Sequence, residues 1–386
     1  MKTSSCIPKI VIIGGGFAGV QVAKQLVRQH AQAVITLVSD REYLTYYPSL
    51  YSLVTDGTQS SVALPLDTLL HESVHFMKGA FTSVDQSKQI VTIMQGERET
   101  TLPYDYLVMA LGSQANYFNI PGLEERSLSF KSVDAALILK SHFETTFAKS
   151  KNLDKESLAA RLHVLIVGGG PSGIELASTL KNYLKCRAKA HGIDPSFVTI
   201  DLIEAGPRLL PTMSEKVSMI AEKRLRTLGI NIFTNRSLQA ENGTEVDLGD
   251  MEVKTNTVIW TAGTSINSLY PGIEGVTLTE RKRVTVTEYL ALPNDNHVFI
   301  AGDGAATRYS GLAQTAIHNG NYIGKTIARM IKQKPLIPYQ PHEPVFVIPV
   351  GKQWGIFSYK NIVLKGYFIG ILRTIIDWRY RFSTKK

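Results

Sequence analysis

Cysteine is almost absent from this chain of 386 residues, which contains only Cys6 and Cys186. Two cysteines exclude a disulfide scaffold and favour a reducing compartment. The sequence also has no apolar run near the roughly 20 residues that a membrane-spanning helix needs. No apolar signal-peptide core precedes the first predicted strand. We therefore expect a protein without transmembrane helices, and its length suggests two or three domains.

Acidic residues are scarce at the carboxyl end. From Lys352 to Lys386 there are eight basic residues and one acid, Asp377, so this segment holds seven of the nine net positive charges. A basic excess confined to one end predicts contact with an anionic partner, either phospholipid or nucleic acid. No nucleic-acid recognition motif accompanies the charge, so we do not expect nucleic acid.

Glycine, in contrast, is concentrated in two similar stretches. The apolar strand Ile10–Ile13 leads into Gly14-Gly15-Gly16-Phe17-Ala18-Gly19, then an amphipathic helix and a strand over Val34–Val38. The strand Val164–Val167 leads likewise into Gly168-Gly169-Gly170-Pro171-Ser172-Gly173, a helix, and a strand over Thr199–Ile203 that ends at Glu204. Two βαβ units about 150 residues apart indicate a domain-scale duplication. We predict an α/β fold with two doubly wound, Rossmann-like domains.

The glycine spacing has a physical reason at each position. The first glycine (Gly14, Gly168) permits a tight turn, and the second (Gly16, Gly170) lets the backbone approach a pyrophosphate. The third (Gly19, Gly173) lets helix and strand pack closely. A bare βα turn is the plain alternative, but strand and helix flank the pattern both times. Two dinucleotide sites in one chain are explained by hydride transfer between a nicotinamide and a flavin.

An acid at the end of the second strand of each unit is expected to bind ribose hydroxyls. Glu204 has that place in the second unit and favours NADH, although Arg208 leaves NADPH open. In the first unit the choice between Ser39 and Asp40 stays open.

The rest of the chain suggests a division into three parts. Short strands and polar turns over 85–105 predict a β-meander that leads to Ala110-Leu111-Gly112, and Trp260-Thr261-Ala262-Gly263 repeats that ending after the second unit. We expect a discontinuous first domain (1–115 with 285–332), a second domain over 160–275, and a carboxyl-terminal region over 335–386. That last region should hold strands near Val345–Ile348 and Trp354–Ser358 and a final helix.

These residues resemble a known family. The two glycine fingerprints, Ala110-Leu111-Gly112, Trp260–Gly263 and Ile300-Ala301-Gly302-Asp303-Gly304 are similar to the two-dinucleotide-domain flavoprotein reductases. Tyr46-Tyr47-Pro48-Ser49-Leu50-Tyr51, Ile174-Glu175-Leu176-Ala177 and Gly311-Leu312-Ala313-Gln314-Thr315-Ala316 resemble, more narrowly, the type II NADH:quinone oxidoreductases. The resemblance covers nearly the whole chain.

The resemblance implies FAD in the first domain and NADH in the second. It places Gly16 and Asp303 on FAD, Gly170 on the NADH pyrophosphate, and Glu175 near nicotinamide and flavin, where it would position NADH or relay protons. Glu175 as an ordinary helix residue is the alternative. Further cofactor contacts are implied at Ala18, Ala110, Gly112, Ala262, Gly263 and Gly302.

The same resemblance implies that Ala313 and Gln314 line a quinone pocket. The chain departs from the family at His318, where a second glutamine is usual. His318 could donate a hydrogen bond or a proton to a reduced quinone, or be a structural histidine. Disulfide and sulfide chemistry is not expected, because neither Cys6 nor Cys186, which we place beyond the second fingerprint's helix, is positioned as a redox thiol.

The final helix is predicted to be amphipathic. Phe368, Ile371, Leu372, Ile375 and Ile376 fall at helical spacing, with Trp378 and Tyr380 as interfacial anchors. Such a helix suits a monotopic contact with anionic lipid, and packing on the core or in a dimer is the alternative.

The leading prediction is a non-proton-pumping NADH:quinone oxidoreductase, peripheral on the cytoplasmic face of the cell membrane. A soluble reductase of a protein acceptor such as a ferredoxin, and a redox-sensing protein resembling apoptosis-inducing factors, are the rivals. A homodimer is left open.

Overall fold

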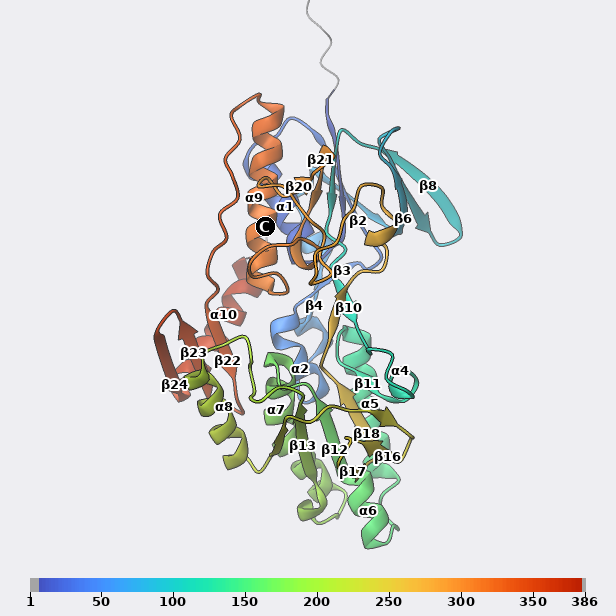
Figure 1. Cartoon of the computed structure of the whole chain (residues 1–386), viewed down its shortest axis with the longest axis vertical. Coiled ribbons are helices and arrows are strands. Elements are labelled where there is room, and N and C mark those ends of the chain that lie inside the picture. The colour runs from blue at the N-terminus through green and yellow to red at the C-terminus, as the bar shows by residue number, and fades with distance from the viewer. Residues whose placement is uncertain (1–6, 384–386) are drawn as a thin grey trace, which may run out of the picture.

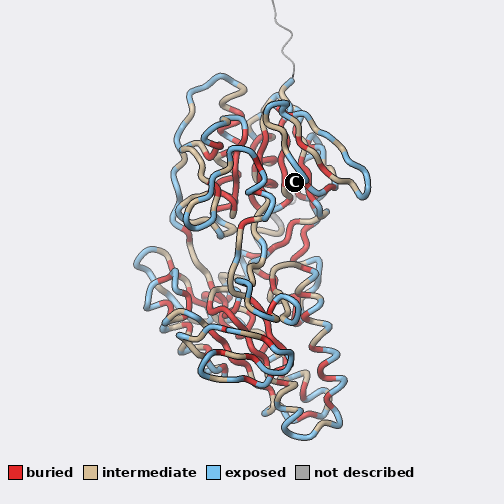
Figure 2. Tube along the Cα trace, turned by 45° about the vertical axis from the view of Figure 1, so that its right-hand side comes forward, coloured by how far each residue is buried: buried red, intermediate tan, exposed pale blue. Residues whose placement is uncertain are grey.

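A computed structural model describes residues 7–383 of the chain. Two lobes are stacked along the long axis, and the carboxyl-terminal elements lie beside the place where the lobes meet (Figure 1). Each lobe has its own buried interior, seen as two separate red zones in Figure 2. The predicted α/β fold with parallel sheets is therefore observed.

The first lobe is built on a six-stranded sheet with the order β20-β21-β9-β1-β2-β5. All neighbours pair in parallel except β20 and β21. The strands are β1 (Lys9–Ile13), β2 (Val34–Ser39), β5 (Val74–Lys78), β9 (Tyr106–Met109), β20 (Ala291–Leu292) and β21 (Asp295–Ile300). Because β20 and β21 return to this sheet from far along the chain, the lobe is discontinuous in sequence.

Two long helices of the first lobe pack closely together. They are α1 (Phe17–Arg28), which follows the first glycine turn, and α9 (Ala313–Ile331). Gly320 and Gly324 of α9 face α1 so closely that an added Cβ would lie 2.5 Å from the Ala18 carbonyl oxygen and 2.7 Å from Gln25 Cβ, respectively. Glycine at these two positions therefore sets the distance between the helices.

The second lobe is built on a fully parallel sheet with the order β11-β18-β12-β13-β14. The strands are β11 (Leu128–Ser129), β12 (His163–Val167), β13 (Thr199–Glu204), β14 (Asn231–Thr234) and β18 (Thr257–Trp260). Helices of this lobe are α5 (Val133–Ala148), α6 (Lys155–Leu162), α7 (Pro171–Ala190) and α8 (Glu215–Thr227). The expected division at residue 160 stays a prediction, and β11 and α5 join this lobe before that point.

The duplication extends beyond the βαβ units. Each central sheet receives a strand that follows a three-stranded antiparallel meander. The first meander is β6 (Ala80–Asp85), β7 (Ile90–Gln95) and β8 (Arg98–Pro103), and the second is β15 (Ala240–Glu241), β16 (Glu245–Asp247) and β17 (Glu252–Lys254). The strands β10 (Ser113–Ala115) and β19 (Thr264–Ile266) follow the two predicted strand-to-glycine endings and pair antiparallel. This two-stranded ribbon joins the lobes.

The carboxyl-terminal region contains the two predicted strands, a third strand and the predicted helix. These are β22 (Phe346–Pro349), β23 (Gly355–Tyr359), β24 (Ile362–Gly366) and α10 (Tyr367–Ser383). The shorter elements of the chain are β3 (Tyr43–Thr45), η1 (Tyr47–Ser49), α2 (Leu50–Val54), η2 (Gln59–Ser61), β4 (Ala63–Pro65), α3 (Leu66–Leu69), α4 (Leu123–Arg126), η3 (Pro195–Phe197), η4 (Tyr270–Gly272) and η5 (Gly302–Gly304).

Two sequence predictions require correction. Cys186 does not lie beyond the second fingerprint's helix, because α7 continues to Ala190, and Cys186 is an exposed residue within it. Tyr380 is not an interfacial anchor, because its ring packs 5.7 Å from that of Phe17 and 4.9 Å from that of Tyr46. Cys6 lies outside the described residues.

Candidate active site

A cavity with a volume of ≈ 550 Å³ lies against both lobes. From the first lobe it is lined by the glycine turn after β1, the ends of β2 and β9, the start of α9 and the segment at 301–303. From the second lobe it reaches Ser172 and Glu175, the first residues of α7 after the second glycine turn. One cavity therefore touches both predicted dinucleotide units.

The first glycine turn provides room for a ligand backbone. Gly14 has φ +113°, and an added Cβ there would lie 2.2 Å from the Ala110 carbonyl oxygen. Gly16 faces open space, with nothing within 4 Å of an added Cβ. At Gly19 the added Cβ would meet the Gly14 carbonyl oxygen at 2.0 Å. The positive φ of Gly14, the open space at Gly16 and the close contact at Gly19 are the geometry that the spacing predicts. The turn has room for a pyrophosphate at the amino end of α1, and binding there stays a prediction.

Both candidates at the end of β2 line the cavity. Ser39 is buried, and its Oγ accepts a hydrogen bond of 3.2 Å from the Arg41 backbone amide. Asp40 is largely exposed and lies 4.0 Å from the Arg41 guanidinium. The choice between them for the ribose thus remains a prediction.

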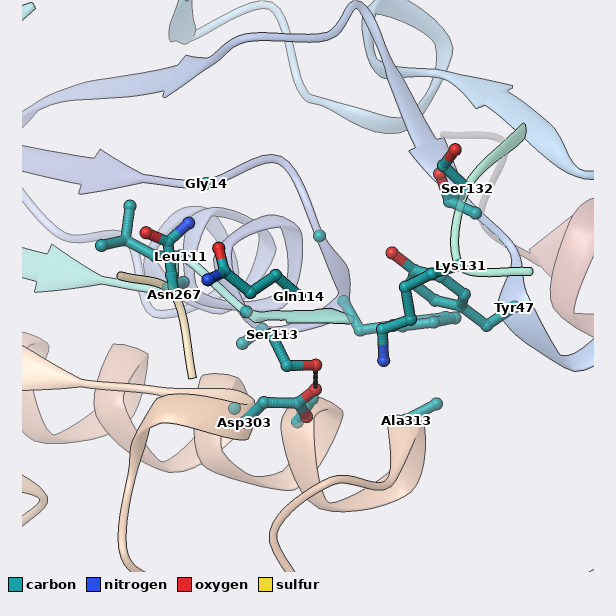
Figure 3. Close-up of a pocket in the computed structure, with 18 of the residues that line it drawn as sticks. Gly14, Tyr47, Leu111, Ser113, Gln114, Lys131, Ser132, Asn267, Asp303 and Ala313 are labelled. Atoms are coloured by element: carbon teal, nitrogen blue, oxygen red, sulfur yellow. Dashed lines mark hydrogen bonds between the residues drawn. The ribbon is translucent and has the colours of Figure 1, made fainter. Parts of the chain in front are cut away.

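The opposite wall is formed by the segment before α9. Gly302, at φ +69°, donates its amide to Oδ1 of the fully buried Asn319 at 3.1 Å. Asp303 accepts a hydrogen bond from the Ser113 hydroxyl, the contact that is dashed in Figure 3, and its carbonyl accepts one from Arg283. Asp303 is therefore fixed on both sides, with its carboxylate in the cavity wall.

Several lining residues are absent from the sequence prediction. They include Tyr47, Ser113, Gln114, Lys131, Ser132 and Asn267 (Figure 3). Lys131 Nζ lies 5.7 Å from the centre of the Tyr47 ring. Burial lowers the pKa of Lys131, while Asp303 opposes that shift. Lys131 lies in the short connection between β11 and α5, where no periodicity or motif marks it. Tyr47, in contrast, belongs to a motif that the resemblance already used.

Glu175 stands out as the acid that α7 brings into this cavity. It is half-buried in the wall, and burial raises its pKa to about 8. Arg373 opposes this shift and Asp377 adds to it, so the charged face of α10 acts on the same carboxyl group. The pKa of Glu175 is therefore well above that of an ordinary exposed helix glutamate.

The second glycine turn repeats the first but lies outside this cavity. Gly168 has φ +117°, Gly170 faces open space, and an added Cβ at Gly173 would meet the Gly168 carbonyl oxygen at 1.9 Å. Glu204 accepts the Gly169 amide at 2.8 Å and the Gly206 amide at 2.7 Å. The carboxylate of Glu204 therefore lies directly at this turn, as its position at the end of β13 predicts.

The two strand-to-glycine endings differ in their surroundings. Ala110 and Gly112 line the cavity, and an added Cβ at Gly112 would meet nothing within 4 Å. Ala262 and Gly263 do not line it, and an added Cβ at Gly263 would lie 2.5 Å from the Phe118 ring. Only the first ending borders the cavity.

The structure does not bring Gln314 and His318 into the cavity, although Ala313 lines it. The Gln314 amide donates to the Val345 carbonyl at 2.5 Å and accepts the Val345 amide at 3.1 Å. His318 Nε2 lies 2.8 Å from the Gln340 carbonyl, and its ring centre is 3.9 Å from that of His342. Both side chains face the connector that leads to β22. Burial lowers the pKa of His318.

The sequence profile of the family described as "Pyridine nucleotide-disulphide oxidoreductase" matches residues 8–320. Among curated relatives, the chain is 31% identical to the type II NADH:quinone oxidoreductase Ndh of Mycobacterium tuberculosis, over 98% of this chain and 85% of that protein. It is 30% identical to the demethylphylloquinone reductase NdbB of Synechocystis, over 98% of this chain and 93% of that protein.

Solved structures agree with this classification at the level of the fold. NDH2 of Plasmodium falciparum in complex with NADH superposes with a TM-score of 0.87 at 19% identity, covering 98% of this chain and 97% of that one. The sulfide:quinone oxidoreductase of Aquifex aeolicus gives 0.82 at 19% identity, covering 98% and 91%. The chain therefore belongs to the pyridine nucleotide-disulphide oxidoreductases and, within them, to the type II NADH:quinone oxidoreductases. The predicted resemblance is confirmed.

Proposed function

We propose that the protein is a non-proton-pumping NADH:quinone oxidoreductase with FAD as its cofactor. The observation that carries this proposal is the single cavity that borders the first glycine turn and also reaches Ser172 and Glu175 beside the second one. Electron transfer between two dinucleotides requires that their reactive ends meet, and one shared cavity meets that requirement. The relatives named above act on NADH and a quinone or are named for quinone reduction.

Each lobe has a separate part in cofactor binding. FAD would be held along the cavity of the first lobe by Gly14, Gly16, Gly112 and Asp303. NADH would be held at the second turn by Gly170 and Glu204. When bound, FAD supplies the redox chemistry, since it takes up a hydride from NADH and passes on two electrons. The backbone amides at the amino ends of α1 and α7 favour the phosphates.

Glu175 is the residue that we assign to proton handling. Its carboxyl holds a proton below about pH 8 because burial raises its pKa. Reduction of a quinone to a quinol consumes two protons, so a neutral carboxyl at the cavity wall is a suitable donor. Arg373, whose charge opposes this rise, would limit how tightly the proton is held.

Ala313 and the start of α9 would form the quinone side of the cavity, because Ala313 lines it. Gln314 and His318 lie next along the same helix but are engaged with the connector. A role for either residue in quinone binding would need the segment at 340–345 to move away from α9.

The exposed surface of α10 and β24 is the proposed membrane contact. On α10, Phe368 is 77% exposed, Ile371 51%, Ile375 53% and Trp378 59%. Ile362 and Leu364 of β24 are also more than half exposed. No helix within residues 7–383 is long and apolar enough to span a membrane. Apolar and aromatic side chains beside a basic excess favour a peripheral contact with an anionic bilayer, which would bring lipid-dissolved quinone to the cavity. We propose the cytoplasmic face for this contact, because NADH is supplied there.

NADH oxidation by the purified FAD-loaded protein, with and without a short-chain quinone, tests the function. Rapid turnover only with quinone is expected. If NADH bleaches the flavin and quinone does not restore its colour, the electron acceptor is a protein or the complex is a redox sensor, and the proposal is wrong.

The lipid contact is tested separately with the double variant I371S/I375S and vesicles of phosphatidylcholine with phosphatidylglycerol. The variant should lose co-sedimentation with the vesicles, because it removes apolar surface from two side chains that are more than half exposed. Ile138→Ser is the matched control, since Ile138 is 60% exposed on α5. Sedimentation without lipid shows whether a second copy of the chain covers this surface instead.

A further inference from the structure

Helix α10 exposes its apolar side and buries a charged residue on its inner side, which is the reverse of an ordinary surface helix. Its large apolar residues Phe368, Ile371 and Ile375 face outward, whereas the charged Asp377 is only 6% exposed. A surface helix normally buries its apolar stripe and exposes its charges. On its inner side, Ile369 is buried and Tyr380 packs on the core of the first lobe.

A buried polar cluster holds the inner side of the helix. We call it the α10 clasp and define it as Arg373, Asp377, Tyr46 and Ser49. Arg373 Nε lies 3.0 Å from each Asp377 carboxylate oxygen. The Tyr46 hydroxyl donates to Asp377 Oδ1 at 2.8 Å, and the Ser49 hydroxyl donates to Oδ2 at 3.0 Å.

Arg373 extends the clasp to the backbone of two further elements. Its two terminal nitrogens donate to the carbonyls of Pro48, in η1, and Val347, in β22. Burial by itself lowers the pKa of Arg373, and the charges of Glu175 and Asp377 more than reverse that shift. Because removal of one partner of a buried charge pair leaves the other uncompensated, the clasp is expected to form or break as a unit.

The clasp reaches the cavity through a short stretch of chain. The clasp contacts Tyr46, Pro48 and Ser49. Their neighbours in the same five-residue stretch, Tyr47 and Leu50, line the cavity. The side chain of Tyr47 lies at the cavity edge beside Lys131 (Figure 3). The backbone that presents this wall is therefore bonded to the helix whose outer face is exposed and apolar.

We infer that Asp377 is a positioning residue. Through the clasp it fixes the 46–50 segment, so that the seating of α10 determines where Tyr47 and Leu50 lie in the wall of the cofactor cavity. The inference deepens the proposed function and rests on it for the effect on quinone and for the lipid contact of α10. Contact of the outer face with lipid would favour the seated helix, and the clasp would pass that preference to the wall.

The test uses full-length FAD-loaded protein and the variant Asp377→Asn, which keeps the shape of the side chain and removes its charge. Amide hydrogen exchange should become about tenfold faster both in α10 and in residues 46–50 when the buried pair is broken. The visible circular dichroism of the bound flavin should change, since it depends on the surrounding wall. The KM for quinone should rise about fivefold, while flavin reduction by NADH changes less than twofold.

Two further variants separate loss of the clasp from a general change in the charge of α10. Arg379→Gln is the matched control, because Arg379 is an exposed charge on the same helix. Tyr46→Phe removes only the hydroxyl that binds Asp377 and should give the same changes to a smaller extent. If Asp377→Asn does not fold, Tyr46→Phe decides by the same measurements.

Faster exchange confined to α10, with residues 46–50 and the flavin dichroism unchanged, would overturn the inference, as would no change in either segment. Failure of the wild-type protein to reduce quinone would sink the proposed function instead. Amide hydrogen exchange and flavin circular dichroism would still test the inference about the clasp in that case, because neither measurement requires an electron acceptor.

Discussion

The two glycine turns have nearly the same backbone but different surroundings. Gly14 and Gly168 have φ values of +113° and +117°, and Gly16 and Gly170 both face open space. The first turn opens on the large cavity, whereas the second is closed at its side by the carboxylate of Glu204. The two turns therefore share a backbone geometry and differ in the residues around them, and we propose that this difference suits them to two different dinucleotides.

The helices that follow the turns differ at one informative position. Gln21 of α1 and Glu175 of α7 occupy equivalent places, two residues after the third glycine. The Gln21 amide donates to Asn321 of α9 at 2.7 Å, so it serves packing within the first lobe. Glu175 instead points to the cavity that the other lobe provides. The duplicated βαβ unit accounts for the equivalent positions of Gln21 and Glu175. The arrangement of the two lobes accounts for the different surroundings of these two side chains.

The largest effects are expected where the turns are packed most tightly. Gly19→Ala should abolish FAD binding, because its Cβ would lie 2.0 Å from the Gly14 carbonyl oxygen. Gly173→Ala should keep the flavin and lower the rate of its reduction by NADH at least about a hundredfold, since overpacking of a turn costs about 1–3 kcal/mol and also misplaces the ligand. Flavin absorbance and stopped-flow reduction measure the two results.

Gly272→Ala is the control, since nothing lies within 4 Å of an added Cβ there. Equal loss of FAD in both variants would contradict separate sites.

The proton of Glu175 should be visible in a pH profile. Below about pH 8 its carboxyl is protonated, so quinone-dependent flavin re-oxidation should fall as pH rises through that value. Glu175→Gln should slow re-oxidation about tenfold and remove the inflection near pH 8. Gln21→Ala is the matched control and should leave the profile unchanged. An unaltered inflection in Glu175→Gln would assign it to another group.

Glu204 should set the choice of nicotinamide cofactor. Glu204→Ala removes the negative charge that a 2′-phosphate would meet, and it also frees the amides of Gly169 and Gly206. We expect the preference for NADH over NADPH, measured as the ratio of kcat/KM values, to fall about tenfold. An unchanged ratio would remove the role assigned to this residue.

The smallest expected effect concerns stability in the second meander. Glu241 of β15 is 4% exposed, one carboxylate oxygen has no hydrogen-bond partner, and burial raises its pKa to about 7. The folded protein therefore binds this proton more tightly than the unfolded chain does, so stability is lost as pH rises from the unfolded value of 4.5 through 7. Glu241→Gln should stabilise the protein by about 1–2 kcal/mol at pH 8 and by almost nothing at pH 4. Thermal unfolding at the two pH values measures this, and an equal gain at both would show that ionisation is not the cause.

Much of the fold could be predicted because it depends on local rules. Apolar strands, glycine spacing and helical periodicity predicted β1, α1, β2, β12, α7 and β13, and the meander after β5 was expected from its polar turns. The site was predicted only where a motif marks it. Lys131 and Asn267 were missed because each enters the cavity from a connecting segment without a pattern of its own.

The final helix shows the limit of periodicity. Its spacing predicted an amphipathic helix, and α10 is one. Periodicity, however, does not tell which face of the helix points outward. Tyr380 looked like an interfacial anchor by type, yet it stacks on Tyr46 inside the protein. The resemblance placed Gln314 at a quinone pocket and left a quinone role for His318 open, but both side chains turn toward the connector.

The sequence by itself determined the class of this protein, since two glycine fingerprints in strand–turn–helix context demand two dinucleotides, whatever else the chain does. Only the tertiary structure decided that the pKa of Glu175 is raised, because this pKa depends on burial and on charges from a helix about 200 residues away in sequence. It likewise decided that Asp377 faces inward and binds Tyr46 and Ser49. Backbone turns follow from neighbouring residues, whereas burial and electrostatic surroundings depend on which distant segments meet.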